Sequence, residues 1–133
     1  MQTVVDLKEL LAHMQPELNP GRYAFVALPS GHALDPIHVV ASIREPEGLS
    51  VILPERAALD LGLPIAFTAA WITLTVLSDL AAVGLTAAFS QALGQAGISC
   101  NVVAGVHHDH LFVPVEQAQL AMDTLHALAR SAA

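Results

Sequence analysis

An internal repeat restricts the fold of this chain more than any other feature of its sequence. The apolar segment 39–43, VVASI, resembles the segment 102–106, VVAGV. Each leads into a polar turn, REPEG in the first copy and HHDH in the second, and then into another apolar segment and the start of a helix. Because copies of one supersecondary unit bury their apolar faces alike, the repeat predicts two halves with the same arrangement of elements.

The apolar periodicities around the repeat indicate the order strand, helix, strand, strand, helix in each half. The first half has only the loop 29–37 where its first helix is expected. With an adjoining strand, this order is the βαββαβ arrangement of a ferredoxin-like fold, an α+β class with antiparallel sheets and helices on one face. We place the halves at residues 1–65 and 66–133. The expected strands are 23–28, 38–45, 49–53, 67–77, 98–106 and 110–115, and the expected helices are 6–18, 54–62, 83–96 and 116–130.

The leading helix over 6–18 belongs to neither copy of the repeat. Asp6 is its predicted N-cap, and Pro16 shortens or kinks its end. We expect it to fill the place of the first helix that the first half lacks. Gly62 and Gly97 are predicted to end two later helices, because glycine readily adopts the left-handed conformation at a helix C-terminus.

Composition narrows the range of functions. The chain has 5 Lys and Arg against 12 Asp and Glu, a net charge of −7, and no basic cluster, which argues against nucleic acid and anionic lipid as partners. Hydrophobic residues make up 54% and charged residues 13% of the chain, so we expect part of its surface to be buried in a homo-oligomer, a dimer or larger. The single cysteine, Cys100, excludes an intramolecular disulfide and a cysteine-based zinc site.

Residues 61–78 are long and apolar enough to require a test of a membrane interpretation. Pro64 interrupts the stretch, and Thr73 and Thr75 alternate with apolar residues, a period of two that indicates a strand. The first ten residues, MQTVVDLKEL, have neither the basic region nor the apolar core of a signal peptide. We therefore expect a cytoplasmic protein without a membrane span.

The segment 71–105, WITLTVLSDLAAVGLTAAFSQALGQAGISCNVVAG, resembles an ACT domain. The resemblance rests on an apolar strand, a short loop, Gly84 near the helix start, and the pair Gly97-Ile98 that leads into the next strand. The whole chain is similar to proteins with two ACT-like halves, such as the paired ACT modules of aspartate kinases and CASTOR-type arginine sensors. The resemblance implies a small module that senses an amino acid or similar ligand, without a cofactor, and regulates an enzyme on a separate chain.

The resemblance also implies a ligand site where the first strand of the second half meets its helix. Unpaired N–H groups at a helix start bind a carboxylate, and hydroxyl and amide side chains supply further donors and acceptors. A structural interpretation stays open, in which Ser78 or Asp79 caps the helix, Gly84 permits tight packing and Asn101 bonds across strands. The positions that match effector-site positions are Ser78, Asp79, Val83, Gly84, Leu85, Thr86 and Asn101.

The turn of the second copy places His107, His108, Asp109 and His110 in four consecutive positions. Neighbouring residues of a strand point to opposite faces, so each face offers two ligands, fewer than the three or four that a structural or catalytic metal needs. A polar hairpin turn and a metal or proton-linked site therefore both stay open. We assign no metal ligand, no catalytic residue and no cofactor.

Three functions are compatible with these features. The preferred one is a non-enzymatic ACT-type regulatory or sensor protein that binds an amino acid or a similar small ligand. The first alternative is a small enzyme or metal-binding protein that uses the cluster His107–His110, although the chain has no nucleophile elbow, phosphate loop or zinc motif. The second alternative is a purely structural oligomerisation module.

Overall fold

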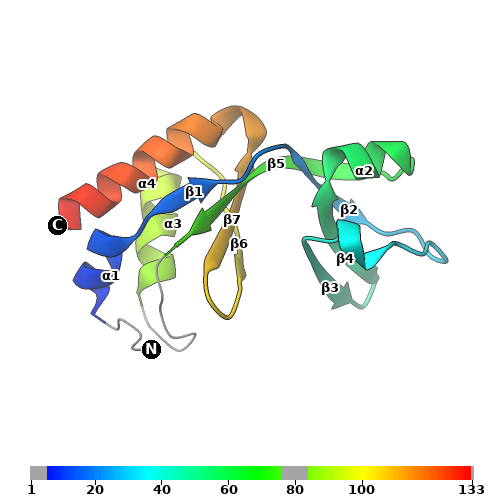
Figure 1. Cartoon of the computed structure of the whole chain (residues 1–133), viewed down its shortest axis with the longest axis horizontal. Coiled ribbons are helices and arrows are strands. Elements are labelled where there is room, and N and C mark those ends of the chain that lie inside the picture. The colour runs from blue at the N-terminus through cyan, green and yellow to red at the C-terminus, as the bar shows by residue number, and fades with distance from the viewer. Residues whose placement is uncertain (1–5, 76–83, 133) are drawn as a thin grey trace. The chain divides into compact units, whose positions relative to one another are not determined.

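Two compact units make up the chain (Figure 1). The computed structural model describes residues 6–75 and 84–132. Unit 1 combines the residues up to Asn19 with those from Trp71 onward, and unit 2 is Pro20–Ala70. Both contain antiparallel strands with helices packed on them, so the predicted α+β class is confirmed. The elements are α1 (Leu7–His13), β1 (Pro16–Leu18), β2 (Tyr23–Ala27), the 3-10 helix η1 (Pro36–His38), β3 (Ala41–Glu45), β4 (Gly48–Pro54), α2 (Glu55–Asp60), β5 (Ile65–Leu74), α3 (Leu85–Gln95), β6 (Asn101–Ala104), β7 (Asp109–Pro114), the 3-10 helix η2 (Val115–Gln117) and α4 (Ala118–Ala132).

Unit 2 has the strand order β3-β4-β2-β5, and its neighbouring strands are antiparallel. Counted along the chain, this is the order of a ferredoxin-like sheet, with the second strand at one edge and the fourth at the other. The connection from β2 to β3 contains the short η1 in place of an α-helix, so the predicted lack of the first helix is confirmed. Helix α2 packs on the strands over a core of Ala24, Val26, Val51, Leu53, Ala58 and Leu63.

Unit 1 repeats this order with β6, β7, the C-terminal part of β5, and β1. Its fourth strand comes from near the start of the chain, because β1 pairs antiparallel with β5 and places Leu18 opposite Ile72. Helix α1 packs against α3 and α4 of the same unit. The expectation that the leading helix fills the vacant place in the first half is therefore wrong.

The leading helix is also shorter than the sequence indicated. Asp6 caps it as predicted, since its carboxylate accepts a hydrogen bond of 3.2 Å from the backbone N–H of Glu9. However, α1 ends at His13, and Pro16 begins the strand β1 instead of continuing a helix to residue 18. Proline has no N–H to donate and its ring clashes with the preceding helical turn, which explains why the helix stops before it.

The two halves share local geometry where the sequence repeats. β4 and β7 each end in three consecutive buried residues followed by a half-buried proline. Pro54 has φ −54° and ψ 136°, and Pro114 has φ −52° and ψ 134°, so both turn the chain into the following helix in the same way. Gly62 and Gly97 follow α2 and α3 with φ of 64° and 77°, which confirms the predicted helix ends.

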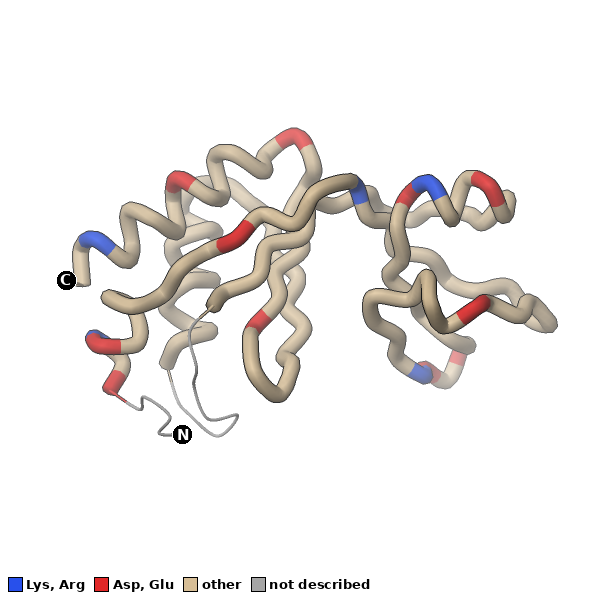
Figure 2. The backbone as a smooth tube through the Cα atoms, viewed as in Figure 1, with Lys and Arg blue, Asp and Glu red and all other residues tan. Residues whose placement is uncertain are grey.

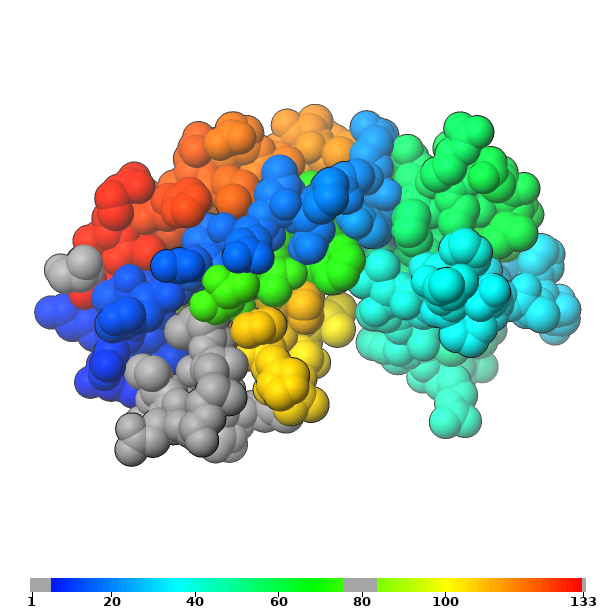
Figure 3. Space-filling model, in the orientation of Figure 1, coloured from blue at the N-terminus to red at the C-terminus, as the bar shows by residue number. Residues whose placement is uncertain are grey.

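Helix α3 contains no Lys, Arg, Asp or Glu (Figure 2). Its Leu85, Phe89 and Leu93 are buried, and α1 and α4 pack beside it. The hairpin of β6 and β7 reaches the surface of unit 1 (Figure 3), where Val106 at its turn is 73% exposed. Among the described residues, no helix combines the length and apolar character that crossing a membrane requires.

Candidate functional site

The start of α3 presents backbone N–H groups that have no partner within the helix. Gly84 is the N-cap residue with φ 104°, it offers no side-chain cap, and the first turn of the helix contains no acidic residue. The first N–H groups of an α-helix have no partner within the helix, and the helix dipole adds partial positive charge at this end. Both effects favour an anionic group such as a carboxylate.

The N-cap differs from the one expected from the sequence. Because the helix begins at Leu85, its cap is Gly84 and not Ser78 or Asp79. Ser78, Asp79 and Val83 themselves lie outside the described residues.

The other predicted site residues near the start of α3 differ in packing and exposure. A Cβ at Gly84 would lie 3.1 Å from Cδ2 of Leu7, so this glycine also permits close packing of α1 on α3. The side chain of Leu85 is buried at 4% exposure, so it could contribute only its backbone N–H to a site. The side chain of Thr86 is exposed.

Asn101 lies in β6, the element that follows α3 along the chain. It begins β6, one of the two edge strands of unit 1, where it is exposed and opposite Phe112 of β7. The structure thus brings Gly84, Leu85 and Thr86 together at one helix start but places Asn101 beyond the opposite end of this helix, at the beginning of β6.

The histidine cluster divides between a turn and a strand. His107 and His108 lie in the turn, whereas Asp109 and His110 begin β7. The indole Nε1–H of Trp71 donates a hydrogen bond of 3.0 Å to Nδ1 of His110. Burial lowers the pKa of His110, the neighbouring His108 lowers it further, and Asp109 partly opposes them. The lowered pKa favours the neutral form of His110, and because Nδ1 accepts the indole N–H, the proton of that neutral form is on Nε2.

The described cluster is not arranged as a metal site. Nδ1 of His108 is buried and has no hydrogen-bond partner in the described part of the chain, while His107 is exposed. Within residues 6–75 and 84–132, no three His, Cys, Asp or Glu side chains are grouped so that they could hold a metal ion. Proton exchange at His110 is the chemistry that this arrangement supports.

No sequence signal linked Trp71 to His110. The period of two places Trp71 and Thr73 on one face of their strand, and the Thr73 hydroxyl also lies 3.3 Å from Nδ1 of His110. The identity of the neighbouring strand follows from the sheet topology, in which β7 lies beside β5. Trp71 also stacks on Phe112, with the ring centroids 6.1 Å apart.

The fold defines the class as an α+β protein with two ferredoxin-like halves. The ACT domain family matches residues 2–70 and, in a second match, residues 67–127. The chain therefore belongs to the ACT domain family and contains two ACT domains.

Solved structures agree with this assignment. VC0802 from Vibrio cholerae, a protein of unknown function described as a possible transport protein, is 45% identical, with a TM-score of 0.82 over 92% of this chain and 95% of that chain. Atu0741 from Agrobacterium tumefaciens is 20% identical, with a TM-score of 0.65 over 88% and 90% of the two chains. The ligand-free regulatory subunit of aspartate kinase from Thermus thermophilus is 13% identical, with a TM-score of 0.61 over 85% and 95%. These last two similarities concern the fold alone. A search of curated proteins found no match.

Proposed function

We propose that this ACT protein is a non-enzymatic regulator or sensor that binds an amino acid or a similar small ligand at the start of α3. The observation that carries the proposal is a helix of 11 residues whose first turn has no acidic side chain and whose N-cap, Gly84, has no side chain at all. In this proposal the N–H groups of Leu85 and Thr86 bind the ligand's carboxylate, which the helix dipole also attracts.

Side chains from two copies of the chain would complete the site. Thr86 donates its hydroxyl to the carboxylate. Asn101 lies beyond the other end of α3 in its own copy, so in this proposal the Asn101 amide oxygen of a neighbouring copy accepts a hydrogen bond from the ligand's ammonium group across an ACT–ACT interface. Ser78, Asp79 and Val83 are assigned to the same site by their positions before the helix. Exposure of Thr86 and Asn101 supports these roles, because neither side chain is taken up by the core.

We also propose that the protein acts as a cytoplasmic homo-oligomer and that any enzyme it regulates is a separate chain. Charged residues form only 13% of the sequence, and Ile43 on the edge strand β3 is 61% exposed. Burial of such apolar surface between copies would lower the free energy of the assembly. Light scattering coupled to size-exclusion chromatography tests this part, and a monomer at all concentrations would contradict it.

A thermal-shift screen of the common amino acids, each with and without zinc, tests the ligand. A ligand at 100 times its Kd stabilises a protein by about 2.7 kcal/mol, so we expect one amino acid or a small group of them to raise the Tm clearly. The shift should be reduced in Thr86→Ala and Asn101→Ala. It should persist in Thr124→Ala, a matched control whose hydroxyl bonds to Leu120 O within α4.

Two outcomes would overturn the proposal. Stabilisation by zinc alone, lost in His110→Ala, would favour a metal-binding protein. No response to any amino acid would favour a structural oligomerisation module.

A further inference from the structure

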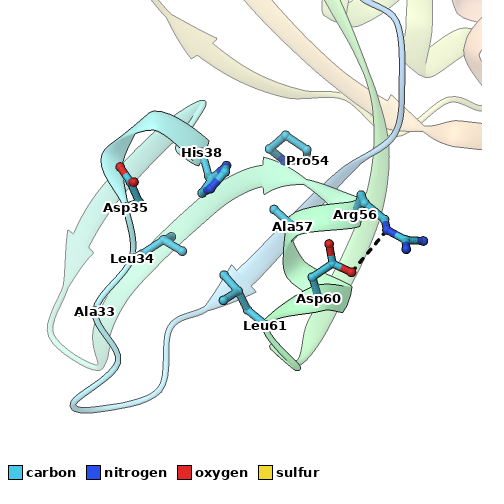
Figure 4. Close-up of a pocket in the computed structure, with 9 residues that line it drawn as sticks. All are labelled: Ala33, Leu34, Asp35, His38, Pro54, Arg56, Ala57, Asp60 and Leu61. Atoms are coloured by element: carbon cyan, nitrogen blue, oxygen red, sulfur yellow. Dashed lines mark ion pairs between the residues drawn. The ribbon is translucent and has the colours of Figure 1, made fainter.

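Unit 2 contains a hollow of about 460 Å³ that the proposed site at α3 does not include (Figure 4). It lies between α2 and the loop that connects β2 to β3, with Leu34 and His38 on the loop side and Ala57 and Leu61 on the helix side. Pockets that bind small molecules have volumes of roughly 300–1,000 Å³, so the hollow has the size of a ligand site.

The hollow follows from the lack of a helix in the first ACT domain. In the second domain, the helix between the first two strands is α3, whose Leu85, Phe89 and Leu93 are at most 4% exposed. In the first domain the same connection is a loop, and its Leu34 packs against the edge of the unit 2 core. Two leucines, Leu28 and Leu34, replace the apolar stripe of a whole helix, and the space beside α2 stays open.

The walls of the hollow are mainly apolar. Leu34 and Ala57 are partly buried against the core, Pro54 lines the hollow from the end of β4, and Leu61 at the end of α2 is 48% exposed. Covering the exposed part of Leu61 with hydrocarbon is favourable, at roughly 25 cal/mol for each Å² removed from water. A ligand with a hydrocarbon body therefore fits this space.

The charged side chains at the rim of the hollow favour a ligand with a positive charge. Two carboxylates, Asp35 on the loop side and Asp60 on the helix side, line the hollow together with one guanidinium, that of Arg56, so the carboxylates outnumber the guanidinium by one. Arg56 Nε pairs with one oxygen of Asp60 at 3.3 Å, and the guanidinium lies at the outer side of the hollow, away from Leu34 (Figure 4). Oδ1 of Asp35 accepts a hydrogen bond of 3.0 Å from Ile37 N–H. Each carboxylate retains a second oxygen that can accept a hydrogen bond from a cation.

We propose that this hollow is a second ligand site, specific for a small primary amine with an aliphatic body. The hydrocarbon lies against Leu34 and Leu61, and the ammonium group binds the free oxygen of Asp60. A carboxylate with the same body is repelled by the excess negative charge, and an uncharged alcohol gains the apolar contacts alone.

Calorimetric titration of the full-length protein with three probes tests this site. The probes are 3-methylbutylamine, 4-methylpentanoate and 3-methylbutanol, which share one hydrocarbon body and differ in charge. We expect the amine to bind at least about fivefold more tightly than the other two, the size of one favourable exposed ion pair. Asp60→Asn and Leu61→Ala should each weaken amine binding, whereas Glu47→Gln, an exposed acid outside the hollow, should not.

Any of three results would overturn the amine site. The first is that 3-methylbutylamine at millimolar concentration gives no heat of binding, and the second is that 4-methylpentanoate binds as tightly as the amine. The third is that the affinity for the amine is unchanged in both Asp60→Asn and Leu61→Ala. Leu61 and Asp60 are exposed, so both variants should fold, and circular dichroism checks this. Thr86→Ala should leave the affinity for the amine unchanged, because Thr86 is outside the hollow. The experiment can therefore reject the amine site without rejecting the proposed amino-acid site in unit 1, and the reverse.

Discussion

The indole Nε1 of Trp71 donates a hydrogen bond of 3.0 Å to Nδ1 of His110 on the neighbouring strand β7. An indole N–H can donate but not accept, so this bond exists only while Nδ1 carries no proton. Trp71 is the chain's only tryptophan. The protonation state of one histidine is therefore coupled to the environment of the one strong fluorophore of the protein.

Acid should destabilise the protein through His110. Its pKa is lowered in the folded chain, first by burial and then by His108, so below the ordinary histidine pKa of about 6.5 the unfolded chain binds a proton that the folded chain does not. The free energy of unfolding therefore falls as the pH falls from about 6.5 through the folded pKa. In His110→Asn, which keeps an acceptor for Trp71 but does not titrate, Tm should fall less between about pH 7.5 and 5.5. Equal losses of Tm in the two proteins would contradict this account.

Trp71→Phe should raise the pKa of His110. The substitution keeps a ring against Phe112 and removes the donor that stabilises the neutral imidazole, at a cost of about 1 kcal/mol in stability. Thr73→Val is the matched comparison, because the Thr73 hydroxyl makes the longer contact of 3.3 Å, and its effect should be smaller. Titration of His110 by NMR measures both, and an unchanged or lower pKa in Trp71→Phe would refute the role of the indole.

Substitution by alanine should change the stability of the protein in opposite directions at two glycines, one at the start of α3 and one inside it. Gly84→Ala should destabilise the protein by roughly 1–2 kcal/mol or more, since φ is 104° and the new Cβ would lie 3.1 Å from Leu7. Gly94→Ala should stabilise it by about 0.5–1 kcal/mol, because Gly94 is inside the helix and nothing lies within 4 Å of an added Cβ. Denaturant unfolding gives both values, and stabilisation by Gly84→Ala would show that the packing of α1 on α3 is misassigned.

Cys100 should react slowly with alkylating reagents. Burial raises its pKa from 9.0 to about 11, and the thiolate is the reactive form. At mildly alkaline pH the folded protein should therefore be alkylated about 100-fold more slowly than the denatured chain. Mass spectrometry of iodoacetamide reactions measures this ratio, and similar rates would place the thiol in a more polar environment.

The repeat was sufficient to predict most of the fold. Its two copies became β3-β4-α2 and β6-β7 followed by α4, and the loop in place of the first helix was visible from its length and composition. The role of the leading segment was not predictable in the same way. β1 has only three residues, too few to show a period, and its pairing with β5 is a long-range contact that depends on the whole sheet. The division of the sequence at residues 65 and 66 stays a prediction.

The candidate sites were also predictable only where they depend on local sequence. The position of Gly84 at a helix start follows from local sequence, and the structure places it within one residue of the helix. The pairing of Trp71 with His110 and the hollow beside Leu61 depend on which elements become neighbours. Local periodicity does not contain that information.

The most direct test of the sensor proposal is a ¹H–¹⁵N NMR titration of the full-length protein with the amino acid that stabilises it most. The account predicts that the backbone amide signals of Leu85 and Thr86 and the side-chain amide of Asn101 move and saturate together. In the Thr86→Ala variant, the Leu85 and Asn101 signals should move less at the same concentrations. Signals at the start of α3 that remain fixed while others move, or no movement with any amino acid, would contradict it.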